Sequence, residues 1–186
     1  MEFTGIDKVT EGKFITLYNA KYKTESGNEK IYEMVSRDKN IQSLGDLKKD
    51  KCDAVILIIE NEDRTKILLN KEFRMAVGNY AYNFPAGLID PGEDCATAGR
   101  RELWEETGLE LLTVDEIWPM SYSGVGITNE RSMCLLGTAR GEFSKSTSDE
   151  EEIEAGWYSK DELRELLKQG NFAARTQAFC QMWVRT

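Results

Sequence analysis

The 186-residue sequence contains no histidine, and this absence restricts its chemistry. A serine–histidine–aspartate triad, a cysteine–histidine pair, a histidine-liganded zinc ion and a histidine general base are all excluded. Acid, base and metal chemistry must therefore come from carboxylates.

Long apolar segments are also absent. The longest unbroken apolar run is Ala54 to Ile59, far short of the roughly 20 residues that span a bilayer. The N-terminus has neither the basic start nor the apolar stretch of a secretory signal. Four cysteines without a Cys-x-x-Cys pair indicate buried reduced thiols rather than a zinc site or a disulfide framework. We therefore expect a cytoplasmic protein without a membrane segment.

Positive charge is scarce. The chain has 24 Lys and Arg against 33 Asp and Glu, which gives a net charge of -9. This balance disfavours nucleic acid and anionic membranes as partners. The length, with 40% hydrophobic and 31% charged residues, is typical of one globular domain with a small appendage.

The pattern of alternating residues divides the chain into two parts. Residues 1–48 predict a small antiparallel β lobe, with strands at 13–18 and 30–35 around a turn at 25–28. Residues 49–186 predict the main domain with a mixed sheet. Its expected strands are 54–59, 66–69, 80–84, 111–118, 132–139 and 153–158.

Three helices are expected in the main domain. The first runs from Asp94 to Thr107 and ends at Gly108, the residue type that commonly follows a helix. The second begins at Ser159 with a capping box to Glu162 and continues to residue 169, and the third spans 172–185. Helices on both sides of a mixed sheet predict an α/β/α sandwich.

The helix at 94–107 concentrates negative charge. Glu102 and Glu106 are four residues apart and share a face, and Glu105 flanks them. Like charges at this spacing favour a compensating cation, and Mg²⁺ or Mn²⁺ suits oxygen ligands. The alternative is an ordinary surface helix whose glutamates are solvated.

The spacing around this helix resembles the signature of the Nudix hydrolases. Gly87, then Glu93, then Arg101 to Leu109 match the family pattern without a gap. The resemblance implies hydrolysis of a diphosphate, with Glu102, Glu105, Glu106 and the Ala86 carbonyl as metal ligands. It also implies catalytic roles for Arg101 and Glu105, a pair between Arg101 and Glu93, and structural roles for Gly87 and Gly108.

The flanking residues resemble the ADP-ribose pyrophosphatase branch of that family. Arg74 precedes the Pro-Ala-Gly entry to the signature and would bind a phosphate. The N-terminal lobe resembles an arm that binds the base and is shared in a homodimer. In this resemblance Phe14 and Tyr32 stack on adenine, Glu33 accepts from its amino group, and Arg37 reaches a phosphate.

The general base is expected in the acidic segment 148–155. The resemblance selects Glu151, with Glu150 and Glu152 as alternatives, and an ordinary solvated acidic loop is the competing interpretation.

The sequence thus predicts Mg²⁺-dependent hydrolysis, with Mn²⁺ as an alternative ion, of ADP-ribose to AMP and ribose 5-phosphate. Another nucleotide sugar such as GDP-mannose, or a dinucleotide, is the main alternative substrate. Asn83 stands where many relatives carry glutamate, and the segment 123–130 lacks a proline that many of them have. A ligand sensor without catalysis is the alternative from a different functional class.

Overall fold

The computed structural model describes residues 1–147 and 152–186. Its backbone forms two compact units. One contains residues 1–53 and 120–132, and the other contains residues 54–119 and 133–186. In the described residues, no helix is both long and apolar enough to cross a bilayer. None of the four cysteines is in a disulfide, and three of them are buried.

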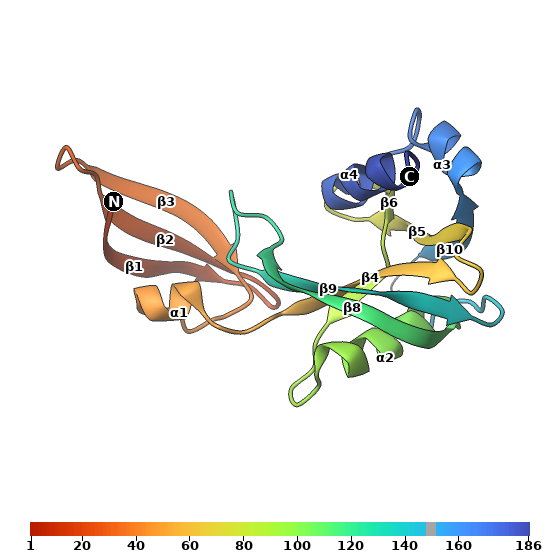
Figure 1. Ribbon diagram of the computed structural model, residues 1–186. Coiled ribbons are helices and arrows are strands. Elements are labelled where there is room, and N and C mark those ends of the chain that lie inside the picture. Colours follow the sequence, from red (N-terminus) through yellow and green to blue (C-terminus); the bar gives the residue numbers. More distant parts are fainter. Residues whose placement is uncertain (148–151) are drawn as a thin grey trace. The chain divides into compact units, whose positions relative to one another are not determined.

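The N-terminal unit contains a three-stranded antiparallel sheet (Figure 1). Its strands are β1 Glu2–Glu11, β2 Thr16–Lys23 and β3 Glu29–Ser36, with β2 in the centre. Buried Tyr18, Met34 and Ile41 form its small core, and α1 Leu44–Lys48 packs Leu47 against it. The predicted lobe is therefore present, but its elements β1 and α1 were not predicted from the sequence.

The missed elements gave weak signals. No residue of β1 is buried, so the strand has no apolar alternation to mark it. Helix α1 has a single turn and a capping box between Ser43 and Asp46. Aspartate replaces the usual glutamate or glutamine in that box, and the surrounding residues resemble a polar linker.

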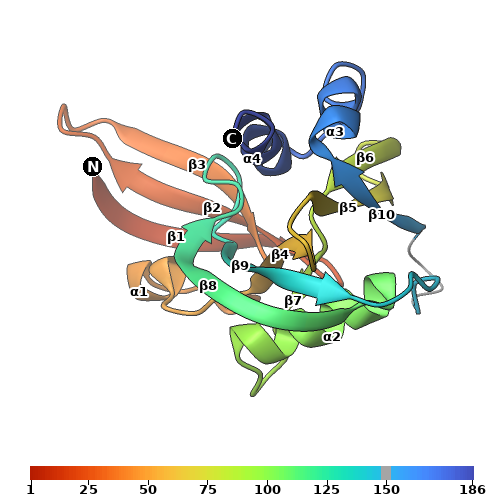
Figure 2. The ribbon, with the colours of Figure 1, turned by 45° about the vertical axis from the view of Figure 1, so that its right-hand side comes forward.

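The second unit is built on a mixed, seven-stranded sheet. The strand order is β10-β5-β4-β9-β8, with β6 paired to β5 and β7 paired to β4. Figure 2 shows β10 beside β5. The strands are β4 Ala54–Asn61, β5 Lys66–Arg74, β6 Asn79–Asn83, β7 Ala86–Leu88, β8 Glu110–Tyr122, β9 Arg131–Arg140 and β10 Ile153–Ser159. Six of these were predicted, and the three-residue β7 was not.

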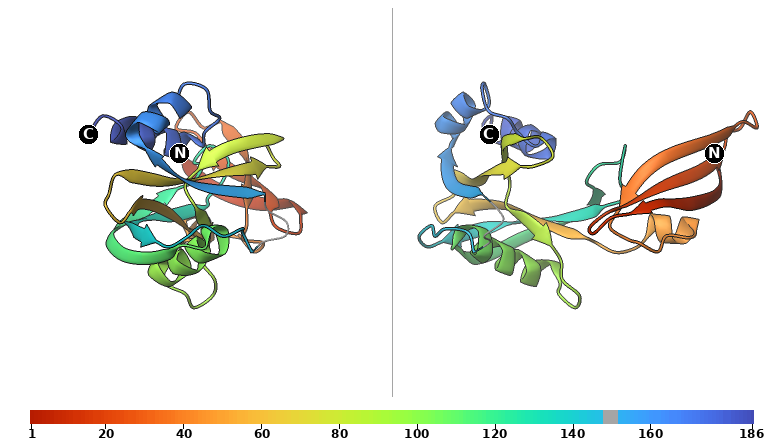
Figure 3. Two further views of the ribbon diagram at one scale, coloured as in Figure 1. Left: turned by 90° about the vertical axis from the view of Figure 1, so that its right-hand side faces the viewer. Right: turned by 180° about the vertical axis from the view of Figure 1, so that it is seen from behind.

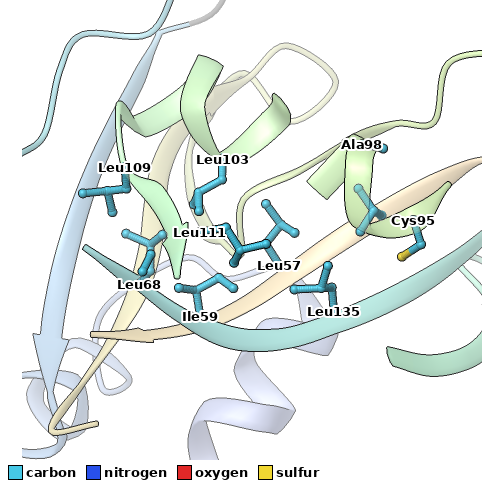
Figure 4. Packing of buried hydrophobic residues seen from close by; sticks show 11 residues of the cluster. Leu57, Ile59, Leu68, Cys95, Ala98, Leu103, Leu109, Leu111 and Leu135 are labelled. Carbon is cyan, nitrogen blue, oxygen red and sulfur yellow. The ribbon is translucent and has the colours of Figure 1, made fainter. Parts of the chain in front are cut away.

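Helices cover both faces of this sheet, which confirms the predicted α/β/α sandwich. Helix α2 Cys95–Thr107 lies on one side, and α3 Lys160–Leu166 and α4 Ala174–Trp183 lie on the other (Figure 3, left). The central strand β4 is buried on both faces because its residues alternate between two cores. Leu57 and Ile59 face α2, and Ile56 and Ile58 face α3 and α4. Figure 4 shows the core beneath α2.

The helix ends follow local sequence signals. Asp94 caps α2 by accepting from the Thr97 amide at 2.7 Å, and Gly108 ends it in the left-handed conformation with φ 76°. The capping box of Ser159 and Glu162 begins α3 as predicted. Helices α3 and α4 are shorter than expected at 160–166 and 174–183, because their terminal residues turn out of the helix.

Candidate metal centre on helix α2

Arg101, in the middle of α2, forms a two-pronged ion pair with Glu93. Its Nε and Nη2 atoms donate to the two Glu93 carboxylate oxygens at 3.0 and 2.8 Å. Nη2 also donates to the Leu88 carbonyl at 2.9 Å. The predicted pair of Arg101 and Glu93 is thus present, and it ties the loop before α2 to the helix.

The remaining end of Arg101 contacts two of the helix glutamates. Nη1 donates to Glu102 Oε1 at 2.7 Å and to Glu105 Oε2 at 3.2 Å. The hydrogen bond to Glu93 is the main reason why the pKa of Arg101 is raised. The same bond lowers the pKa of Glu93. The guanidinium therefore stays charged and acts as the counter-charge of three carboxylates.

Glu102 occupies space that only glycine leaves open at position 87. A Cβ atom on Gly87 would lie 1.9 Å from the Glu102 Cδ atom and 2.0 Å from Oε1. Gly87 and Ala86 belong to β7, which pairs with β4 through Ala86 and Ile56. The side chain of Glu102 is only 13% exposed, so its carboxylate lies against the β7 backbone rather than in bulk solvent.

The last glutamate of the cluster is bound from the sheet. Asn70 Nδ2 on β5 donates to Glu106 Oε2 at 2.7 Å. Asn70 is 2% exposed and lies two residues after Leu68, so it shares the sheet face that α2 covers. This contact was not predicted from the sequence, because a strand pattern does not reveal which helix residue faces Asn70.

A divalent cation fits this set of donors. Hard cations prefer carboxylate oxygens, and α2 carries three glutamates within two turns, one of which, Glu102, lies against the backbone at Gly87. Within residues 1–147 and 152–186, no three acidic or cysteine side chains already converge tightly enough to hold an ion. Arg101 and Asn70 supply their hydrogen bonds instead. To share a cation, the carboxylates of Glu102 and Glu105 have to turn away from Nη1 of Arg101, which now donates to both.

The structure separates the two aromatic residues predicted to bind a base. Phe14 is 66% exposed in the turn between β1 and β2, whereas Tyr32 lies on β3 opposite Ala20. Ala20 is four residues along β2 from Thr16, which corresponds to roughly 13 Å, and Phe14 lies beyond Thr16. The backbone positions of these two residues are therefore well apart along the sheet.

The other N-terminal candidates also have defined positions. Tyr32 and Glu33 are adjacent on β3, so their side chains point to opposite faces. The Tyr32 hydroxyl donates to the Gly126 carbonyl at 2.6 Å. Arg37 Nε donates to Glu130 Oε2 at 2.8 Å.

The remaining candidates lie around β5 and β10. Arg74, at the end of β5, donates to Glu72 and is half exposed. Glu150 and Glu151 lie outside the described residues. Glu152 is exposed and accepts a hydrogen bond of 2.6 Å from the Tyr80 hydroxyl. This bond is the first cause of the raised pKa of Tyr80.

Comparisons with known proteins agree on one family. The NUDIX domain profile matches residues 50–178. The chain is 31% identical to the ADP-ribose pyrophosphatase of Saccharomyces cerevisiae over 140 residues, which cover 73% of this chain and 57% of that protein. It is 29% identical to the ADP-sugar pyrophosphatase of Mus musculus over 143 residues, which cover 75% of this chain and 62% of that protein.

The fold also matches a solved structure. The crystal structure of an ADP compounds hydrolase superposes with a TM-score of 0.75 at 17% identity, covering 100% of this chain and 95% of that one. The chain spans about three-fifths of the length of the yeast and mouse enzymes. On the profile match and the geometry of α2, the chain belongs to the Nudix hydrolase family.

Proposed function

We propose that this protein hydrolyses the diphosphate bond of ADP-ribose and releases AMP and ribose 5-phosphate. The observation that carries the proposal is the Arg101 ion-pair network, which joins Glu93 in the loop before α2 to Glu102 and Glu105 on the family's signature helix. The names of the yeast and mouse relatives support an ADP-ribose or ADP-sugar substrate.

The proposed cofactor is Mg²⁺, with Mn²⁺ as an alternative. Glu102, Glu105 and Glu106 would hold it, together with the carbonyl oxygen of Ala86. When bound, such an ion neutralises diphosphate oxygens and lowers the pKa of a coordinated water molecule. The protein's own contribution is to hold the loop at Glu93 against α2 through Arg101 and to leave room for Glu102 at Gly87.

Five further residues are proposed to contact the substrate. Arg74 and Arg37 are the proposed phosphate ligands, because a guanidinium can form two parallel hydrogen bonds to phosphate. Their partners Glu72 and Glu130 then have to release them. Phe14, Tyr32 and Glu33 are proposed to contact the base, in line with the proposed division into a binding arm at 1–48 and a hydrolase domain at 49–186.

A homodimer is part of this proposal. The backbones of Phe14 and Tyr32 lie well apart along the sheet, and we propose that a base is enclosed by one ring from each of two copies. The N-terminal unit also exposes many large apolar side chains, which a second copy would cover. These are Val9, Phe14, Ile15, Ile31, Tyr32, Tyr122, Val125 and Ile127.

The substrate proposal is tested by measuring turnover with a panel of diphosphates. The panel contains ADP-ribose, GDP-mannose and a dinucleoside diphosphate, each with Mg²⁺ and with Mn²⁺. We expect the highest kcat/KM for ADP-ribose, with AMP and ribose 5-phosphate as products. A higher value for another member would assign the enzyme to that substrate. No turnover of any member would favour a ligand sensor.

Glu151 is the proposed general base, and its substitution tests that role. Glu151→Gln keeps the size of the side chain but cannot accept a proton, so kcat should fall at least about 100-fold. Mn²⁺ binding, measured by electron paramagnetic resonance, should remain unchanged. Glu150→Gln and Glu152→Gln are the matched controls. Near-normal turnover of Glu151→Gln would assign the role to whichever control variant loses activity.

A further inference from the structure

Asn70 is the polar exception in a buried strand segment. Ile67, Leu68 and Leu69 precede it on β5, and none of the three has measurable exposure. Asn70 itself is 2% exposed. A leucine would fill such a position without burying an amide, so packing alone does not explain an asparagine here.

The amide of Asn70 is only partly satisfied. Its Nδ2 atom donates to Glu106 Oε2 at 2.7 Å, which is short for an N–H donor and typical of a charge-assisted bond. A carboxylate only accepts, so chemistry fixes the orientation of the amide. Its Oδ1 atom is buried and has no hydrogen-bond partner in the described structure. A buried acceptor without a partner lowers stability. The role of Asn70 therefore has to come from its other contact.

The useful contact is the one to the helix glutamate. Glu106 lies one turn after Glu102, and the 2.7 Å bond crosses from the sheet to α2 over 36 positions of sequence. A glutamate side chain has three rotatable bonds, and a donor fixed in a strand restricts them. Second-layer donors of this kind orient the carboxylates that ligate metal ions.

We propose that Asn70 is a positioning residue, whose amide N–H holds the Glu106 carboxylate in the orientation that binds a divalent cation. This inference rests on the proposed function, because it assumes that Glu106 is a metal ligand. The important group is the N–H donor of the Asn70 amide. A side chain of equal size without this donor would pack equally well but would orient Glu106 less well.

The proposal is tested by Mn²⁺ binding to the full-length protein freed of metal, measured by electron paramagnetic resonance. Asn70→Leu should raise the Mn²⁺ dissociation constant roughly 10- to 100-fold. The same variant without metal should still unfold cooperatively, because it removes an unsatisfied buried acceptor but also the donor to Glu106, and these changes oppose each other. The serine side chain of Asn70→Ser is too short to reach Glu106, so this variant should weaken Mn²⁺ binding to a similar extent. It replaces Asn70→Leu in the test if the leucine variant does not fold.

A double-mutant cycle shows whether Asn70 acts through Glu106. In a Glu106→Gln background, Asn70→Leu should change the Mn²⁺ dissociation constant less than twofold. The matched control is Asn129→Leu in the other compact unit. Asn129 is also buried with an unpartnered Oδ1, but it donates to the Leu47 carbonyl. This control should leave Mn²⁺ affinity unchanged.

The outcomes separate this inference from the proposed function. If the wild type binds Mn²⁺ and Asn70→Leu binds it equally well, Asn70 has no positioning role. An equal loss of affinity in the wild-type and Glu106→Gln backgrounds also overturns it, because Asn70 would then act elsewhere. Absence of Mn²⁺ binding by the wild type would overturn the proposed function itself, together with this inference.

Discussion

At the scale of single residues, one guanidinium organises the carboxylates of α2. Arginine has five N–H donors in one plane, so it can bind several carboxylates from fixed directions. Arg101 uses one edge for Glu93 and its remaining nitrogen for Glu102 and Glu105. Lysine offers a point charge without this fork, so the arginine sets geometry as well as charge.

The pair of Glu93 and Arg101 predicts a pH dependence of stability. The pKa of Glu93 is lowered in the folded protein, first through its hydrogen bond to Arg101. An unfolded chain titrates at the ordinary glutamate pKa of about 4.3. The pair therefore stabilises the fold fully above that pH and loses its effect as pH falls through the lower folded pKa.

Glu93→Gln is expected to unfold at lower urea concentration than the wild type at pH 7. The difference should shrink as the pH falls below about 4.3, where the unfolded chain takes up a proton, and should vanish as the pH passes through the lower folded pKa of Glu93. Urea midpoints measured from pH 3 to 7 check this, with Glu25→Gln in the exposed β2–β3 turn as the control. A difference that does not shrink at all between pH 7 and pH 3 would mean that the carboxylate charge is not what stabilises the fold.

Gly87 predicts a loss of metal affinity without a loss of stability. In Gly87→Ala the new Cβ collides with the end of the Glu102 side chain, which can rotate away. The free energy of unfolding should change by less than about 0.5 kcal/mol. Because Glu102 leaves its place, Mn²⁺ affinity should fall about tenfold or more.

Calorimetric unfolding and Mn²⁺ titration measure the two effects of Gly87→Ala. Gly126→Ala is the control, because a Cβ at Gly126 meets no atom within 4 Å. Unchanged Mn²⁺ affinity in Gly87→Ala would remove Glu102 from the proposed set of ligands.

At the scale of secondary-structure elements, local signals were predictable and contacts across the sheet were not. The ends of α2 depend on Asp94 and Gly108, whose effects reach only neighbouring residues, so the sequence revealed them. Asn70 and Glu106 meet only after β5 and α2 pack together. Periodicity shows which residues are buried, but not which residue on another element each one faces.

The same distinction explains the binding residues. The signature around α2 is a local pattern, and the structure joins Arg101 to Glu93 as that pattern implied. The N-terminal candidates depend on strand register: Tyr32 faces Ala20 and is remote from Phe14, and no local pattern encodes that distance. Their roles remain predictions, as does that of Glu151.

The end of α2 predicts a stability change that combines two causes. Gly108 has φ 76°, and its added Cβ would lie 2.2 Å from Ser144 Oγ and 2.8 Å from the Ser144 backbone nitrogen. The left-handed conformation alone costs a non-glycine residue about 1–2 kcal/mol. Gly108→Ala should therefore lower the free energy of unfolding by more than about 1 kcal/mol.

Gly78→Ala separates the cost of the left-handed conformation from the cost of the clash with Ser144 in Gly108→Ala. Gly78 also has positive φ, 65°, but a Cβ there meets nothing within 4 Å. Urea unfolding of both variants should show the larger loss for Gly108→Ala, with an unchanged denaturant slope. Equal losses would mean that the loop holding Ser144 moves aside without cost.

At the scale of the whole molecule, charge and apolar surface act against each other in self-association. Each copy carries a net charge of -9, so two copies repel. The N-terminal unit exposes Ile31 at 59%, Val125 at 78% and Ile127 at 60%, and burying such side chains favours association. Salt screens the repulsion but not the apolar contact.

The proposed dimer should therefore become tighter as salt increases. Raising NaCl from about 20 to 300 mM shortens the screening length from roughly 20 Å to 6 Å, so the dimer dissociation constant should fall several-fold. Sedimentation equilibrium measures it. Ile31→Asp should give a monomer because it adds charge to the apolar surface, whereas Val77→Asp, on an exposed apolar residue of the other unit, should not. A dimer that weakens with salt would indicate an interface held by ion pairs. A wild type that stays monomeric at all salt concentrations would overturn the proposal that two copies share the base-binding arm.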